Sequence, residues 1–105
     1  MILTVFERAL ILNIFPPQQG DIVALRAIRE FREAVSMSPQ EIEEYSVTVD
    51  KVGRMRWDST KAKDKDVEVI PLIKERLSGI LRSLSEEGKL KEEHLSLYDK
   101  FMEDG

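Results

Sequence analysis

The spacing of apolar residues changes twice along this chain of 105 residues, and these changes constrain its fold more than any other feature. Up to about residue 45, apolar side chains recur every three or four positions, which is the period of an amphipathic helix. From residue 46 to residue 70 they alternate with polar side chains, as in β-strands. From Pro71 onward the helical period returns. The pattern therefore predicts an α+β fold that is mostly helical.

The length and the apolar content, 42% of all residues, are sufficient for one modest core. We therefore expect a single domain over residues 1–105. It would hold three N-terminal helices within residues 1–45, a small β region within 46–70 and a C-terminal helical hairpin within 71–105. No internal repeat, low-complexity tract or second domain is visible.

The first helix is expected from about Val5 to Ile14. Thr4 and Glu7 have the spacing of a capping box, and two prolines follow the last turn. The polar residues Glu7, Arg8 and Asn13 do not gather on one face. A helix that is apolar on every side either lies at the centre of the core or is partly buried against another chain.

Two further helices are predicted before residue 46. Asp21 can cap a helix from about Ile22 to Val35, and Ser38-Pro39-Gln40-Glu41 is a capping box with proline at the first helical position, which favours a short helix from about Pro39 to Tyr45. The longer helix has an apolar stripe, made of Ile22, Leu25, Ile28, Phe31 and Val35.

The alternating segment predicts a β-hairpin. Val47 and Val49 alternate with polar residues, and Met55 and Trp57 do so after a turn that contains a glycine. A third extended run, from Asp66 to Ile70, follows a charged linker. We therefore expect either a β-hairpin or a small three-stranded antiparallel sheet.

The C-terminal part is expected to form two antiparallel helices. The first runs from Pro71 to about Glu87 and ends at Gly88, while the second runs from about Lys91 to Glu103. Gly79 lies inside the first of them, where we expect it to allow a close approach between helices. The apolar face of the last helix is predicted to consist of Leu95, Tyr98, Phe101 and Met102.

Composition excludes several classes of function. Without cysteine there is no disulfide framework, thiolate nucleophile, zinc finger or iron–sulfur site, and one histidine leaves no multi-histidine metal site. Sixteen basic and 20 acidic residues give a net charge of −4, with no polybasic segment for nucleic acid or anionic lipid. No apolar run is long enough for a signal peptide or a membrane span, so we expect a cytoplasmic protein.

Two polar clusters were considered as sites of chemistry. His94, Ser96 and Asp99 would have to act together from one helix, where residues two apart do not face each other, so His94 is expected at the edge of an apolar face. Carboxylates that share one face of an extended stretch could hold Mg²⁺, and these are Asp64, Asp66 and Glu68. We favour a solvated charged loop there. No glycine-rich phosphate loop occurs, and we predict no catalytic, metal, cofactor or small-molecule substrate site.

The order of three helices followed by a hairpin is that of a winged helix, which binds DNA. Arg54 and Arg56 on the hairpin would suit a wing that contacts phosphate. The third helix carries Glu41, Glu43 and Glu44, a net charge of −3 that would repel phosphate. A DNA-binding regulator is therefore one alternative. An acidic decoy, which would use these glutamates to occupy the nucleic-acid site of a host protein, is another.

A protein-binding surface remains. A domain of this size can hardly surround the first helix completely, and aromatic side chains are enriched at interfaces. We therefore predict self-association through the first helix or the C-terminal hairpin. The candidate interface residues are Phe6, Leu10, Ile14, Tyr98 and Phe101.

The sequence also resembles a group of small uncharacterised proteins encoded by bacteriophages and prophages. The resemblance rests on Glu7-Arg8, on Leu12-Asn13-Ile14 with the prolines that follow, and on Lys89-Leu90-x-Glu92-Glu93-His94-Leu95-Ser96-Leu97-Tyr98-x-Lys100-Phe101. Lys91 stands where such sequences tend to have a capping threonine. The resemblance implies an origin in a mobile element, and hence the cytoplasm of a host cell, but brings no catalytic motif. The leading hypothesis is a non-catalytic interaction or assembly protein of phage type that forms a homo-oligomer.

Overall fold

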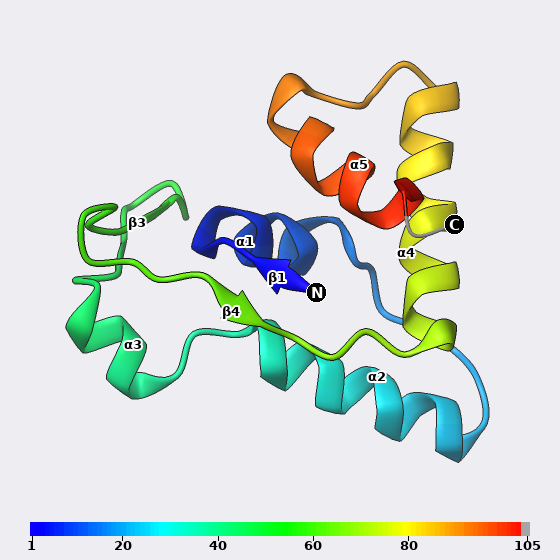
Figure 1. Cartoon of the computed structure of the whole chain (residues 1–105), viewed down its shortest axis with the longest axis horizontal. Helices are drawn as coiled ribbons and strands as arrows, with labels where there is room; N and C mark the ends of the chain where they lie inside the picture. The colour runs from blue at the N-terminus through cyan, green and yellow to red at the C-terminus, as the bar shows by residue number, and fades with distance from the viewer. Residues whose placement is uncertain (104–105) are drawn as a thin grey trace.

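The N-terminal helices begin where local capping signals predict them. The structure is a computed structural model that describes residues 1–103, and its first helix, α1, spans Val5–Ile14 (Figure 1). Thr4 Oγ1 accepts a hydrogen bond from the Glu7 N–H at 3.0 Å, while Glu7 Oε1 accepts one from the Thr4 N–H at 2.9 Å. This reciprocal capping box satisfies two backbone donors that the first turn leaves free.

The next two helices also follow their caps. Helix α2 spans Ile22–Val35, and the side chain of Asp21 accepts from the Ala24 N–H at 2.8 Å. Helix α3 spans Pro39–Glu44 behind the Ser38 capping box, one residue shorter than expected. Each of these starts depends on residues no more than three positions apart, which explains why the sequence predicted them.

The C-terminal part is a helical hairpin, as predicted, but its second helix starts late. Helix α4 spans Pro71–Glu86, and Gly88 follows it with a φ of +70°, which glycine adopts without strain. The 3₁₀ turn η1 (Glu92–His94) then precedes α5 (Leu95–Glu103). Figure 1 shows α5 packed against α4.

The 3₁₀ turn changes which side of the last helix faces the core. Leu95, expected on the apolar face, is 54% exposed, whereas Leu97 is completely buried. His94 and Phe101 are buried on the same side as Leu97. The inward face therefore has residues at positions i, i+3 and i+7 counted from His94, and the prediction for Leu95 is wrong.

The predicted β-hairpin is present but short. Strand β2 (Thr48–Val49) pairs antiparallel with β3 (Met55–Arg56), so that Val49 lies opposite Met55. Gly53, in the connecting turn, has a φ of +83°. Of the two arrangements expected for this region, the hairpin is confirmed.

The third extended run does not join the hairpin, so the alternative of a three-stranded sheet is wrong. Strand β4 (Lys65–Asp66) pairs antiparallel with β1 (Ile2–Leu3), with Leu3 opposite Lys65. Strand β1 was not predicted, because a strand of two residues with a distant partner leaves no local pattern in the sequence. Val67 continues from β4 into the core with 2% exposure.

Helix α1 lies in the middle of the molecule, with α5 on one side and α2 on the other (Figure 1). The expectation that it is central is confirmed, because Leu10 and Ile11 are buried together with the polar Glu7 and Arg8. The other buried apolar residues of this core include Phe15, which follows α1, and residues of α2, α4 and α5. Those residues are Ile28, Phe31, Val35, Ile73, Leu77, Leu81, Leu97 and Phe101.

Two expectations about the helices α2 and α4 are wrong. Ile22 and Leu25 belong to the predicted apolar stripe of α2, but they are 61% and 37% exposed, because each step of three residues turns the stripe by about 60° and carries it away from the buried Ile28. Gly79 was expected to allow a close helix contact, yet a Cβ atom placed there would have no neighbour within 4 Å. Within residues 1–103, no helix is both long and apolar enough to cross a membrane.

Candidate functional site

Glu7 on α1 is a buried carboxylate held by α5. It is 2% exposed, and its Oε1 accepts from Lys100 Nζ at 2.6 Å while its Oε2 accepts from Ser96 Oγ at 3.0 Å. Burial by itself raises the pKa of Glu7, but the hydrogen bonds from Lys100, the Thr4 N–H and Ser96 together outweigh it and lower the pKa. The ion pair between Glu7 and Lys100 therefore connects α1 to α5.

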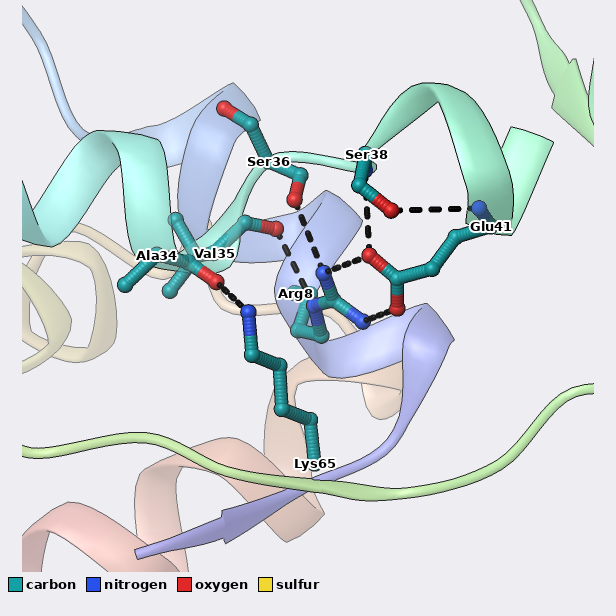
Figure 2. A network of polar contacts seen from close by, with 7 residues as sticks. All are labelled: Arg8, Ala34, Val35, Ser36, Ser38, Glu41 and Lys65. Carbon is teal, nitrogen blue, oxygen red and sulfur yellow. Dashed lines mark hydrogen bonds and ion pairs between the residues drawn. The ribbon is translucent and has the colours of Figure 1, made fainter.

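Arg8, the next residue, connects α1 to the other side of the molecule (Figure 2). Its side chain is fully buried, and its Nη1 and Nη2 donate to the two carboxylate oxygens of Glu41 at 2.7 and 3.0 Å. The same guanidinium donates to the carbonyls of Val35 and Ser36, at 3.1 and 2.8 Å. These bonds from Arg8 lower the pKa of Glu41 to about 2, against the smaller opposing effect of burial.

Lys65 on β4 completes this side of the structure, because its Nζ donates to the Ala34 carbonyl at 2.9 Å (Figure 2). Within residues 1–103, every buried side-chain nitrogen and oxygen has a hydrogen-bond partner. Both charged networks are thus saturated by the protein itself. They hold α1 in place.

The clusters considered for chemistry are drawn into structural contacts. His94 Nδ1 accepts from the Lys91 N–H at 3.0 Å, and Ser96 donates to Glu7, so neither is directed at the other. Asp66 accepts from the amino group of Met1 at 3.0 Å. In the described part of the chain, no three histidine, aspartate or glutamate side chains are arranged to hold a metal ion.

The predicted interface residues do not form one surface. Leu10 and Phe101 are 6% and 1% exposed and belong to the core, so their assignment to an interface is wrong. Ile14 and Tyr98 are partly buried against that core. Phe6 is 40% exposed, and its ring centroid lies 6.1 Å from that of Trp57.

An exposed apolar surface lies instead at the start of α2. Ile22 and Val23 are 61% and 74% exposed, and Leu25 is 37% exposed. A shallow hollow of about 350 Å³, called here the α2 hollow, is lined by Ile22, Leu25, Arg26 and Arg29. Sequence reasoning missed it because the apolar stripe of α2 looks uniform, although Ile22 and Leu25 lie on a different side of the helix from the buried Phe31 and Val35.

The two arginines of the α2 hollow differ from their neighbour on the same helix. Arg32 donates to the carbonyls of Phe15 and Pro16 and lies over the Phe15 ring, 4.6 Å from its centroid. Neither Arg26 nor Arg29 has a hydrogen bond or ion pair from its side chain within residues 1–103. Their charges are therefore available to a partner.

Helix α3 presents a surface of the opposite sign. Glu41 was expected to face outward with the other glutamates, but it is turned inward to Arg8. Glu43 and Glu44 are exposed, and their side chains have no polar partner in the described residues. Ile42, the residue before them, is 43% exposed. Figure 1 shows α3 at the opposite end of the molecule from the start of α2.

The hairpin arginines are accessible, as predicted. Arg54 is exposed, and Arg56 is 73% exposed with its Nε 3.9 Å from Asp50 Oδ2. Glu43 and Glu44, however, occupy the helix with which a winged helix would read DNA. No protein-family model, curated protein or solved structure matches this chain, so its function has to be inferred from its own residues.

Proposed function

We propose that this chain is a non-catalytic protein-interaction module that assembles with copies of itself, and that it is of phage or prophage type and acts in the cytoplasm of the host cell. One observation carries the assembly proposal. Towards the start of α2 its apolar residues turn from the core to solvent, so that Ile22 and Leu25 are exposed together on one side of the helix and Val23 is exposed on a neighbouring side. Monomeric proteins rarely expose contiguous apolar surface unless it binds something.

The strength of the expected contact follows from the size of this surface. An aliphatic side chain contributes about 1.5–3 kcal/mol when it passes from water into an apolar contact. Three such side chains compete with an association cost of at least about 4 kcal/mol, which leaves a modest surplus. The surplus is at most about 5 kcal/mol, so we expect reversible assembly with a dissociation constant of about 0.1 mM or weaker.

Sedimentation velocity over a range from about 10 µM to about 1 mM tests the proposal. The informative variant is Ile22→Glu/Val23→Glu, because these positions begin α2, where negative charge is favourable for the helix. The variant should fold normally and remain monomeric, while the wild type should gain mass with concentration. Val52→Glu is the matched control, since Val52 is 76% exposed on the hairpin and should not affect assembly. A wild type that stays monomeric at every concentration contradicts the proposal.

A second candidate function is nucleic-acid binding through the hairpin, which is supported by the exposure of Arg54 and Arg56. It predicts that duplex DNA binds at low salt, that added salt weakens the complex, and that Arg54→Ala/Arg56→Ala removes it. An electrophoretic shift assay at low ionic strength measures this. If the wild type produces no shift, the candidate is eliminated.

A further inference from the structure

We infer that helix α3 of one copy docks into the α2 hollow of a second copy, so that the copies join head to tail. This inference rests on the proposed self-association and names the two surfaces that meet. One of them is apolar with free positive charge, and the other is apolar with free negative charge.

The residues that line the α2 hollow form a continuous stripe along one side of α2. Ile22, Leu25, Arg26 and Arg29 stand at positions i, i+3, i+4 and i+7, so they lie on one side of α2. The aliphatic pair comes first along the helix and the arginine pair follows. A partner surface that complements the α2 hollow therefore needs an apolar side chain for the aliphatic pair and carboxylates for the arginine pair.

Helix α3 has this composition on its outer side. Pro39, Ile42 and Glu43 stand at positions i, i+3 and i+4, and all three are exposed. Glu44 is also exposed, but it stands two positions from Ile42 on a neighbouring side of the helix, and Glu41 faces inward. The outer side of α3 therefore offers Ile42 and the free carboxylate of Glu43, with the carboxylate of Glu44 at its margin. In the docked pair, Ile42 would contact the two aliphatic residues of the hollow while the carboxylates would meet its two arginines.

The positions of the two surfaces decide how copies are joined. They lie at opposite ends of the molecule, and α2 alone spans about 20 Å, so one copy cannot satisfy both surfaces internally (Figure 1). Two different surfaces make a heterologous contact, which produces a ring or an open chain of copies. A symmetric contact of the α2 hollow with itself would gather four arginines in one interface without any carboxylate from the hollow to balance them, which is unfavourable.

Charge reversal tests this pairing. Arg26→Glu/Arg29→Glu and Glu43→Arg/Glu44→Arg should each weaken assembly by roughly tenfold or more, because two attractive pairs become repulsive. An equimolar mixture of the two variants should assemble again, and so should a chain that carries all four changes. In the mixture, each unaltered surface meets an unaltered one and each reversed surface meets a reversed one.

The control variant is Lys51→Glu/Arg54→Glu, which reverses two exposed charges beside Val52 without touching either surface. It should assemble like the wild type. All substituted side chains are exposed, so circular dichroism should match that of the wild type. If one of the double variants does not fold, the single changes Arg29→Glu and Glu43→Arg provide the same comparison.

The outcomes separate the two proposals. Loss of assembly in Ile22→Glu/Val23→Glu together with normal assembly in Glu43→Arg/Glu44→Arg would overturn the α3 contact and leave self-association standing. Failure of the mixed variants to assemble would likewise overturn it. A monomeric wild type would overturn both proposals, whereas restored assembly in the mixture supports the head-to-tail contact.

Discussion

Replacement of Arg8 by methionine should show how much of the stability depends on its buried ion pair. The substitution keeps an apolar stem of similar size but removes the guanidinium donors to Glu41, Val35 and Ser36, so that the Glu41 carboxylate keeps only the hydrogen bond from the Ser38 N–H. Removing one partner of a buried pair costs about 3–5 kcal/mol, since the other charge is left without compensation. The total stability of a small domain is about 5–15 kcal/mol, so Arg8→Met should lower the denaturation midpoint strongly.

The pKa of Glu41 gives a second measure of how much the contact between Arg8 and Glu41 stabilises the fold. Lowering this pKa from 4.5 to about 2 corresponds to about 3 kcal/mol of stability near neutral pH, at about 1.4 kcal/mol per pKa unit. Because the pKa is depressed in the folded state, this contribution is present above pH 4.5 and is lost as the pH falls towards 2. The difference between wild type and Arg8→Met should therefore shrink over that interval.

Urea denaturation followed by the fluorescence of Trp57, the single tryptophan, measures both effects. Trp57 contacts Phe6 on α1, so its signal should report the loosening of this helix. The double variant Arg8→Met/Glu41→Met should be more stable than Arg8→Met alone, because it removes the uncompensated charge. A loss below about 1 kcal/mol in Arg8→Met, or a double variant that is less stable than the single one, would refute the reasoning.

Three further changes test other parts of the structure. Gly79→Ala should raise the free energy of unfolding by about 1 kcal/mol, since the site is an open helix interior, and an unchanged denaturation midpoint would contradict this. Lys100→Met should destabilise the fold and move acid unfolding to higher pH, because the lowered pKa of Glu7 depends on it; a pH titration of circular dichroism measures this. Ser38→Ala should cost about 1 kcal/mol through the lost cap of α3, as measured by thermal unfolding, and a larger loss would show that the cap also supports the Arg8 network.

The candidate site could be predicted from the sequence only in part. The uneven charge on α3 and the exposed Arg54 and Arg56 follow from the order of residues and from simple periodicity. The α2 hollow does not, because Ile22 and Leu25 carry the same periodic signal as Ile28. What separates them is which side of α2 the neighbouring elements cover, and that depends on the arrangement of the whole chain.

Local signals in the sequence determined the helices and the hairpin. The capping bonds of Thr4 and Ser38 reach only three residues along the chain, so they require no tertiary contact. Tertiary structure alone decided what the two charged residues of α1 do. Arg8 finds Glu41 over a separation of 33 residues, and Glu7 finds Lys100 over 93. No periodicity specifies such pairs, because burial makes each charge require a partner without indicating where along the chain that partner lies.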